Sequence, residues 1–387
     1  MERDAELAIG DRIAALVDES VGRSVAHIDA SVYTDPHRHA AELAALRRNP
    51  AIVAYSSELG TVGDFVVREL WGTPIVVARD NNGVHCYVNA CAHRGATVVT
   101  EPCGRARLHS CPFHGWSYEL DGSLRTISEP DRFGYARDVS TSSVPVGLRR
   151  LACEERHGCI WAVEVGDTPN LDATQGMDVA AWLTPSLDEL FFGLGLADMA
   201  CFRTATYHLA CNWKMITDGF LETYHLKYLH RASIAPYFPS NQINCDRHGP
   251  HFTTFLPKNR LLTQIAERDR DDWDIVNHIT MSTTLVPGTV VQWQAGHVEV
   301  FALRPHLTNP RRCSVDMAML VPSDRLHEAD LWNRNWSRLA NTIPAEDFVA
   351  AEDVQRNIDC GAVTRLTVGA TEHHLVDHLA EIKRLLA

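Results

Sequence analysis

The sequence predicts an α+β protein in which a helical segment, a small all-β module and a mixed region of strands and helices follow one another. Three observations support this order. Apolar residues recur at helical spacing in residues 1–48, short apolar runs alternate with turn signals in 49–165, and strand-like and helix-like stretches are mixed in 166–387. A chain of 387 residues has room for two or three domains.

The helical segment and the β module are each predicted from local signals. Helices are expected over residues 5–21 and 40–48, the second ending before Asn49-Pro50. Hairpins are expected around Asn81-Asn82-Gly83 and Asp121-Gly122, because apolar runs flank both turns. The strands predicted beside these turns span residues 75–78, 84–88, 117–120 and 123–127, and a closing strand spans 158–165.

The third region begins after a linker-like stretch at residues 166–175. Residues 202–210 alternate like a strand, and residues 212–229 are typical of a helix. Adjacent strands are expected over 286–304 and 312–321. The tail from residue 372 places its apolar residues on one helical face, as expected of a packed terminal helix.

Composition excludes several classes of protein. The apolar fraction of 45% and the charged fraction of 22% are ordinary for a globular chain, and no apolar run is long enough for a membrane helix. A net charge of −13 argues against nucleic acid and anionic membranes as partners. The start, Met1-Glu2-Arg3-Asp4, lacks the basic and apolar segments of a signal peptide, so we expect a cytoplasmic protein in which most of the 11 cysteines are unpaired.

Two cysteine–histidine pairs form the first candidate site. Cys91 and His93 lie two positions apart, and Cys111 and His114 lie three apart, in short segments next to the predicted hairpins. In the Rieske arrangement of a [2Fe–2S] cluster, two thiolates bind one iron and two imidazoles bind the other. The neutral imidazoles raise the reduction potential of the cluster. A Cys2His2 zinc site is the alternative, although zinc sites commonly pair like residues in sequence.

Two histidines further along form the second candidate site. His225 and His230 are five residues apart, so on a regular helix they would point about 140° apart. They can share a metal only if the helix ends or bulges between them. Two imidazoles and one carboxylate leave open positions on Fe(II) for oxygen. On spacing alone, two surface or core histidines remain an alternative.

These segments carry a resemblance to a known family. Cys91-Ala92-His93-Arg94-Gly95 and Cys111-Pro112-Phe113-His114-Gly115-Trp116 resemble the two cluster loops of the Rieske non-haem iron ring-hydroxylating oxygenases, alpha (terminal oxygenase) subunit. The stretch from Asn212-Trp213-Lys214 to His230 resembles the mononuclear-iron helix of that family. The resemblance implies that Trp116 and Phe113 screen the cluster from water.

The same resemblance implies roles for three acids. Glu346-Asp347, followed by Glu352 and Val354-Gln355-Arg356, makes Asp347 the third iron ligand, with Asp353 as the alternative. Glu222 stands where the family has an acid, more often Asp, that bridges an iron histidine to the Rieske histidine of a neighbouring subunit. Here that Rieske histidine is His114. Asp218 supports Glu222, or it is only a capping or surface acid.

The function implied is that of a terminal oxygenase. A separate NAD(P)H-dependent reductase, with or without a ferredoxin, supplies electrons. The enzyme then hydroxylates, dihydroxylates or oxidatively demethylates a small organic substrate, aromatic or cyclic, with O2. The implied fold is a β Rieske domain plus a helix-grip catalytic domain, in a homotrimer with or without a β subunit. The alternatives from other classes are a non-catalytic Rieske electron carrier and a zinc-binding hydrolase.

Overall fold

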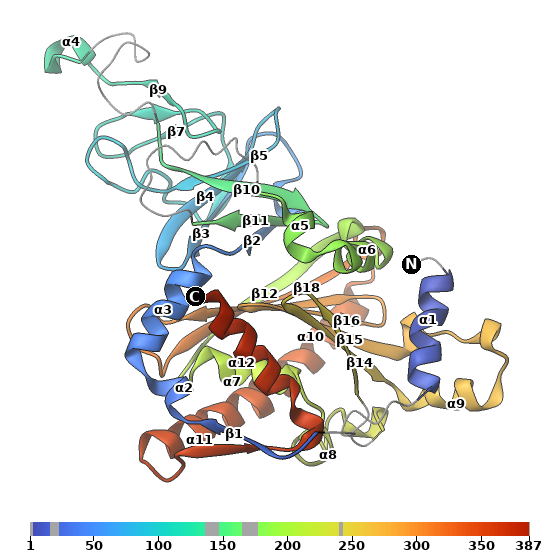
Figure 1. Ribbon diagram of the computed structural model, residues 1–387. Coiled ribbons are helices and arrows are strands. Elements are labelled where there is room, and N and C mark those ends of the chain that lie inside the picture. Colours follow the sequence, from blue (N-terminus) through green and yellow to red (C-terminus); the bar gives the residue numbers. More distant parts are fainter. Residues whose placement is uncertain (1–2, 16–22, 136–146, 165–176, 240–242, 387) are drawn as a thin grey trace. The chain divides into compact units, whose positions relative to one another are not determined.

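The structure is a computed structural model that describes residues 3–15, 23–135, 147–164, 177–239 and 243–386 (Figure 1). It confirms the α+β class, because both helices and antiparallel sheets are present. The chain divides into two compact units. The β unit is Arg47–Trp182, and the mixed unit is Met1–Leu46 together with Leu183–Ala387. The described N-terminal residues, predicted as a segment of their own, thus fall in the mixed unit.

The β unit contains two antiparallel sheets. The order of strands in the larger sheet is β2 (Ala51–Tyr55), β11 (Cys159–Val163), β10 (Arg150–Arg156), β5 (Val84–Val88), β4 (Thr73–Arg79), β3 (Asp64–Leu70) and β6 (Cys103–Arg105). The smaller sheet contains β7 (His109–Ser110), β8 (Ser117–Tyr118) and β9 (Leu124–Thr126). Both predicted hairpins are present, as β4–β5 and β8–β9. The helix α4 (Pro130–Phe133) follows β9.

The core of the β unit contains both cysteines of the first candidate site. Cys91 and Cys111 are buried together with Tyr87, Trp116 and Tyr118 in one apolar cluster. A loop that enters the core in this way is held by the packing of its own side chains, so the two cysteines are positioned before any metal binds.

The mixed unit is built on a seven-stranded antiparallel sheet. Its order is β12 (Met199–Leu209), β18 (Cys313–Pro322), β17 (Val298–Pro305), β16 (Thr289–Gln294), β15 (Ile279–Leu285), β14 (His251–Pro257) and β13 (Asn244–His248). The prediction of one strand over residues 286–304 is wrong. Ala295 and Gly296 adopt positive φ angles of 52° and 107° and turn the chain into the β16–β17 hairpin.

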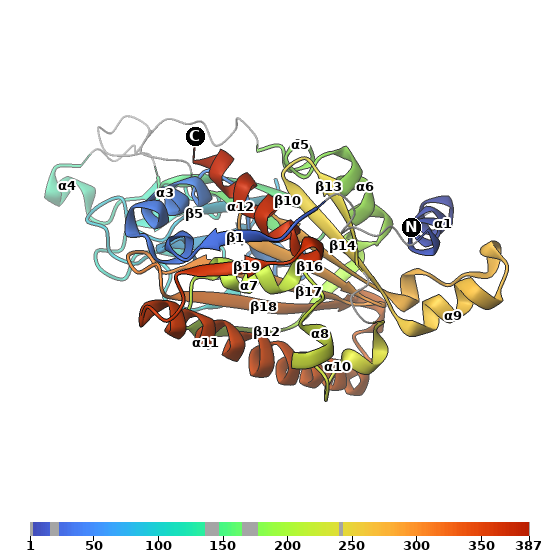
Figure 2. The ribbon, with the colours of Figure 1, turned by 60° about the horizontal axis from the view of Figure 1, so that its bottom comes forward.

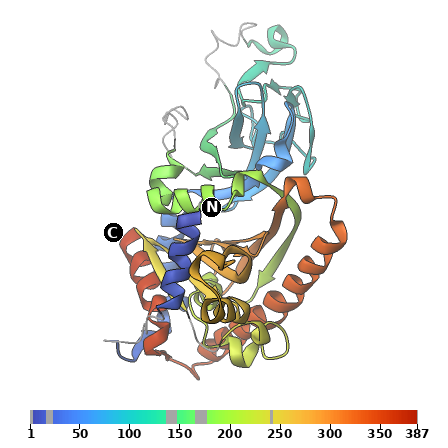
Figure 3. The same ribbon diagram turned by 90° about the vertical axis from the view of Figure 1, so that its right-hand side faces the viewer.

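Helices pack on this sheet and around it. The helix α7 (Trp213–Phe220) lies on β15 and β17. Figure 2 shows α10 (Ala329–Thr342) and α11 (Phe348–Asp359) in line along one side of the sheet, joined by a π-helical turn at Ile343–Asp347. Figure 3 shows α1 (Arg3–Ala14) beside α9 (Asn259–Glu267).

Of the remaining described helices, three have about two or three turns: α3 (Pro36–Leu46), α6 (Pro185–Gly193) and α12 (His374–Leu385). The others are about one turn long: α2 (Ser31–Thr34), α5 (Val179–Leu183) and α8 (Leu226–Leu229). Single 3-10 turns span Ser56–Leu59, Leu196–Asp198, Ala235–Tyr237, Arg270–Asp272, Val276–His278, Ser323–Arg325 and Ala370–Glu372. Among the described helices, none has both the length and the hydropathy needed to cross a membrane.

Within the mixed unit, strand pairing and a buried ion pair join the N-terminal residues to the part that begins at Leu183. The strand β1 (Ala26–Asp29) pairs antiparallel with β19 (Arg365–Val368). The ammonium of Lys214 on α7 bonds to the carboxylate of Glu42 on α3, and both side chains are 1% exposed. Arg38 donates a second bond to Glu42 over 2.8 Å.

This ion pair gives a prediction about stability. Replacing Lys214 by Met leaves Glu42 buried with only Arg38 as a partner, so the free energy of unfolding should fall by about 3 kcal/mol. Urea denaturation measures the change. The double variant Lys214→Met/Glu42→Leu should recover most of the loss, because it removes both buried charges. A double variant no more stable than Lys214→Met would contradict this account.

Candidate metal centres

The two cysteine–histidine loops of the β unit have the same backbone hydrogen bonds. In each loop the cysteine N–H donates to the carbonyl five residues later, Cys91 to Ala96 and Cys111 to Trp116, both over 2.8 Å. In each, the glycine four residues after the cysteine donates back to the cysteine carbonyl. Gly95 and Gly115 have φ angles of +75° and +72°, which a glycine adopts without strain.

These loops bring the four predicted ligands together. The ring centroids of His93 and His114 are 4.6 Å apart. Trp116, 2% exposed, stacks on His93 at 4.8 Å. The Tyr118 hydroxyl lies 3.0 Å from Cys91 Sγ and accepts the Ala92 N–H over 3.1 Å, which leaves its own proton free for the sulfur.

The donor set fits a Rieske cluster. The His93 Nδ1 is buried and has no hydrogen-bond partner among the described residues, which is expected of an atom that binds a metal. The face of the loops opposite the core is exposed. Phe113 is 58% exposed and its ring lies 3.9 Å from His114, whereas Trp116 is a buried screen.

The second candidate centre begins at the start of α7. Asn212 caps this helix, because its side chain accepts the Lys214 N–H over 3.0 Å and donates to the carbonyls of Tyr33 and Pro310. Trp213 is buried, and Lys214 forms the ion pair with Glu42. Each residue of the Asn-Trp-Lys motif therefore fixes α7 in place.

The predicted continuous helix over residues 212–229 is wrong. The helix α7 ends at Phe220, and the four-residue α8 starts at Leu226, with His225 just before it and His230 just after it. This interruption supplies the break that two histidines five residues apart need. Their ring centroids are 5.1 Å apart.

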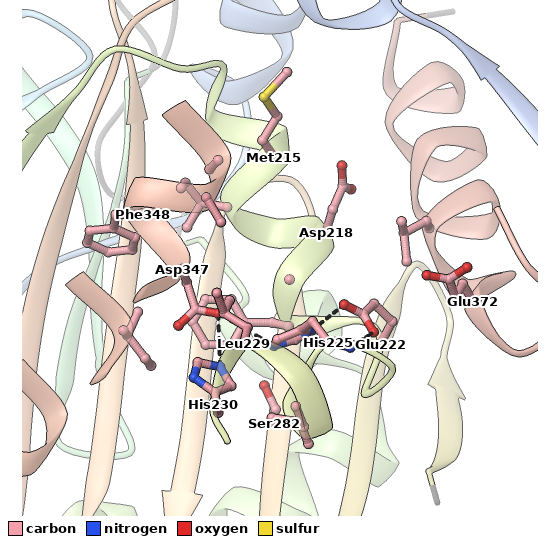
Figure 4. Close-up of a pocket in the computed structure, with 18 of the residues that line it drawn as sticks. Met215, Asp218, Glu222, His225, Leu229, His230, Ser282, Asp347, Phe348 and Glu372 are labelled. Carbon is pink, nitrogen blue, oxygen red and sulfur yellow. Dashed lines mark hydrogen bonds and ion pairs between the residues drawn. The ribbon is translucent and has the colours of Figure 1, made fainter. Parts of the chain in front are cut away.

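A carboxylate from a distant helix meets both histidines. Asp347 Oδ1 lies 3.5 Å from His225 Nε2 and 3.2 Å from His230 Nε2 (Figure 4). These three side chains converge closely enough to hold one metal ion. Asp347 Oδ2 is buried with no hydrogen-bond partner in the described parts of the chain. Two imidazole nitrogens facing a carboxylate suit a divalent cation such as iron.

Each histidine also bonds to a glutamate through its other nitrogen. His225 Nδ1 meets Glu222, and His230 Nδ1 meets Glu346. Ser233 donates to Glu346 over 2.7 Å. Such carboxylates orient the imidazoles, so that Nε2 faces the metal, and increase their basicity. Burial alone would lower the pKa of His230, but its hydrogen bonds to Asp347 and Glu346 raise that pKa.

Sequence reasoning did not assign a role to Glu346. The signal was present, since Glu346 directly precedes Asp347, but adjacent residues on a regular helix face about 100° apart. The π-helical turn Ile343–Asp347 carries both acids to one site. Asp353, the alternative ligand, lies on an exposed face of α11 and pairs with Arg356 over 2.9 Å.

The rest of the acid-rich motif joins α11 to the strand and helix that precede the histidines. The Ala210 N–H donates to Glu352 over 2.7 Å, and the Asn212 N–H donates to Gln355 over 2.9 Å. These bonds hold α11, which follows Asp347, against the start of α7, which precedes His225 and His230. The segments that carry the three candidate ligands are therefore held together.

Asp218 is not a surface acid. It is half-buried on α7, lines the cavity beside the second centre and accepts a hydrogen bond from Tyr33 over 2.7 Å. Burial raises the pKa of Asp218 from 3.8 to about 7, against the lowering effects of Tyr33 and Lys214. Oδ1 of this carboxyl has no partner among the described residues.

The raised pKa predicts a pH dependence of stability. Between pH values of about 4 and 7 the folded protein keeps the proton that unfolded Asp218 has lost, so the free energy of unfolding falls as pH rises through that window. Asp218→Asn stays neutral and can still accept from Tyr33. Its stability relative to the wild type should therefore increase by up to about 4 kcal/mol from pH 4 to pH 8. Urea titrations at several pH values measure this difference, and parallel profiles would contradict the assignment.

A cavity of about 390 Å³ within the mixed unit adjoins the second centre. Its lining includes His225, His230 and Asp347, and most of the remaining wall is apolar. Trp293 and Phe301 of the neighbouring strands are buried and are not among the lining residues. The strands β1 and β19 contribute Ile28 and residues 366–368, which no sequence motif indicated.

Comparisons with known proteins agree with this geometry. One family model, the Rieske [2Fe-2S] domain, matches residues 49–145, and another, the ring hydroxylating alpha subunit (catalytic domain), matches residues 196–387. The chain therefore belongs to the Rieske ring-hydroxylating oxygenase alpha subunits. The two matched domains imply a Rieske cluster and a mononuclear iron.

Individual relatives are more distant. The chain is 28% identical over 264 residues to the anthranilate 1,2-dioxygenase large subunit of Acinetobacter baylyi. The aligned region covers 67% of this chain and only 54% of that protein. It is 22% identical to the chloroplastic choline monooxygenase of Spinacia oleracea, over 86% of this chain and 72% of that protein. The quaternary ammonium Rieske monooxygenase CntA in complex with L-carnitine has the same fold, with a TM-score of 0.74 at 18% identity over 97% and 98% of the two chains.

Proposed function

We propose that this protein is a terminal oxygenase that uses electrons from a separate protein, and O2, to oxygenate a small organic substrate. The observation that carries the proposal is the convergence of His225, His230 and Asp347 beside a cavity, on a chain with a second, Rieske-type ligand set. A two-histidine, one-carboxylate set leaves iron with open coordination positions, and iron bound there supplies the chemistry of oxygen activation.

The roles of the chain's own residues follow from their contacts. Cys91, Cys111, His93 and His114 hold the cluster, with Trp116 as a buried cover on one side. Glu222 and Glu346 orient the two iron histidines by accepting their Nδ1 protons in hydrogen bonds. The apolar cavity wall excludes water around the substrate, which strengthens the electrostatic interactions inside.

We also propose the homotrimer, in which His114 of one chain approaches Glu222 of the next. Three exposed aromatic side chains support it, because they belong to the same two segments as the groups that would meet. Phe113 lies beside His114, and Tyr224 and Tyr228 flank His225, with exposed fractions of 58%, 54% and 61%. Sedimentation equilibrium should then give about three times the chain mass of 43.1 kDa.

The partner that supplies electrons is a reductase, with or without a ferredoxin. A non-catalytic electron carrier would need only the β unit, and it would leave the convergence of three metal-binding side chains in the mixed unit unexplained. The names of the relatives include an anthranilate dioxygenase and a choline monooxygenase, so they leave the substrate open.

Metal analysis and oxygen uptake test this function together. Protein reconstituted under anaerobic conditions should contain about three irons and two sulfides per chain. It should consume O2 when given a surrogate reductase, NADH and a suitable compound from a panel of aromatic, N-methylated and alicyclic molecules. Zinc at both centres without iron would contradict the proposal and favour the hydrolase.

A further inference from the structure

The cavity beside the second metal centre has an unusual distribution of charge. Four carboxyl side chains line it: Asp218, Glu222, Asp347 and Glu372. Within the described residues, neither lysine nor arginine lines it. The parts of the mixed unit outside the described ranges contain neither residue type in their sequence. The buried Lys214 is already held by Glu42. An anionic ligand in this cavity would therefore have no cationic side chain to pair with.

The carboxyl groups of the cavity already have partners of their own. Glu222 bonds to His225, and Asp347 faces the two histidines. Glu372 accepts the Gly369 N–H over 2.6 Å, and Asp218 accepts from Tyr33. A ligand cation would share each of these carboxyl groups with its present partner, and it would find oxygens without a hydrogen-bond partner among the described residues at Asp218 (Oδ1) and Asp347 (Oδ2).

The aromatic side chains of the cavity also give little support to a cation. Binding of a quaternary ammonium group typically uses several aromatic faces around one point, with Trp and Tyr the strongest. Phe220, Phe238 and Phe348 line the cavity, and the rings of Phe220 and Phe348 pack against Phe301 and Tyr207, which are not lining residues. Tyr33 uses its hydroxyl on Asp218.

The sheet provides one polar wall. Thr280 and Ser282 on β15 stand opposite Gln294 and Gln292 on β16, and all four line the cavity. Thr280 donates to Gln294 over 2.9 Å. Gln292 donates to Glu299 over 3.0 Å.

Ser282 differs from its neighbours on this wall. Its side chain is 3% exposed, and its hydroxyl has no hydrogen-bond partner among the described residues. It lines the same cavity as His230, and both are labelled in Figure 4. Burying a hydroxyl without a hydrogen-bond partner costs free energy, because the hydroxyl gives up its hydrogen bonds to water. A ligand group that bonds to the hydroxyl offsets this cost.

We propose that the cavity selects neutral substrates with an apolar body and one hydrogen-bonding group, such as a hydroxyl, carbonyl or amide, which Ser282 orients beside the metal, and that it rejects carboxylates. This inference rests on the proposed function, because it assigns the substrate class of the same site. Ser282 is a specificity-determining residue in this account, and it does not take part in the chemistry.

Binding of three matched probes to the holoenzyme tests the charge rule. Titration calorimetry compares 2-naphthamide, 2-naphthoate and 2-naphthyltrimethylammonium, whose two fused rings suit a cavity of this size. The amide should bind at least about 30-fold more tightly than the carboxylate, because the buried charge of the latter has no cationic side chain to pair with and faces four carboxyl groups. It should also bind more tightly than the ammonium. Equal or tighter binding of either ion, or no binding of the amide, would overturn the proposal.

Two matched variants test the role of Ser282. Ser282→Ala removes the cavity hydroxyl. Thr284→Val removes another buried hydroxyl without a described partner, two residues further along β15 and outside the cavity lining. Ser282→Ala should weaken binding of 2-naphthamide about 3- to 10-fold and leave binding of naphthalene unchanged. Thr284→Val should change neither. Equal binding of 2-naphthamide to the Ser282→Ala and wild-type proteins would overturn the assignment.

These binding measurements do not depend on turnover. Oxygen uptake that is coupled to 2-naphthoate would contradict the substrate class and leave the oxygenase function standing. Protein that binds the probes in the expected order, but never acquires mononuclear iron or consumes O2, would contradict the oxygenase function and leave the charge rule of the cavity standing.

Discussion

Asp347→Ala should abolish oxygenation while it leaves the Rieske absorption spectrum unchanged. The variant keeps His225 and His230 but loses the carboxylate whose oxygen lies within 3.5 Å of both Nε2 atoms. Two imidazoles alone bind a divalent metal weakly, so the second centre should lose its iron, and product formation should fall by at least about 10³-fold. Metal analysis and product quantification measure both effects.

Asp353→Ala is the matched control for this variant. Asp353 lies six residues further along the same helical run, is exposed, and contacts Arg356 rather than the histidines. The control should keep its iron and its activity. If Asp353→Ala lost the mononuclear iron and Asp347→Ala kept it, Asp353 and not Asp347 would be the third iron ligand.

Cys111→Ser should remove the cluster and, with it, every turnover that depends on an external electron donor. The Cys111 side chain is buried in the core of the β unit, and its loop is fixed by hydrogen bonds to Gly115 and Trp116. A serine hydroxyl is far harder to deprotonate than a thiol, and Fe–S clusters need thiolate ligands at this position. The visible absorption of the cluster should disappear, whereas the mononuclear iron should remain.

Cys103→Ser serves as the control, since Cys103 is an exposed residue of the same unit, on β6. Its spectrum and activity should match those of the wild type. A Cys111→Ser protein with full cluster absorption would rule out this residue as a ligand and reopen the question of which cysteines hold the cluster.

The sequence predicted those parts of the sites that are encoded within a few neighbouring residues. The cluster loops were predictable because ligand spacing, glycine position and the flanking hairpins all lie within about ten residues of each cysteine. The pair of His225 and His230 was recognisable for the same reason. The sequence indicated that the helix must end or bulge between the two histidines if they share a metal. It did not indicate whether or where the helix does so.

The parts that were missed depend on register between distant segments. The helix α7 ends at Phe220, although residues 212–229 favour a helix, because the chain must bring both imidazoles to one side. Glu346 reaches His230 because a π-helical turn rotates it there, and no spacing rule indicates such a turn. Ser282 faces the cavity through the alternation of β15, whose register is set by pairing with β14 and β16.

The most direct test of the central claim is a single turnover without any reductase. The cluster is reduced chemically under anaerobic conditions, and the protein is then exposed to ¹⁸O-labelled O2 with the probe that binds most tightly. In iron-replete protein, oxidation of the cluster should accompany the appearance of labelled product, and Asp347→Ala should give no product. Product formation in that variant, or a cluster that is oxidised without product in the replete protein, would contradict cooperation between the two centres.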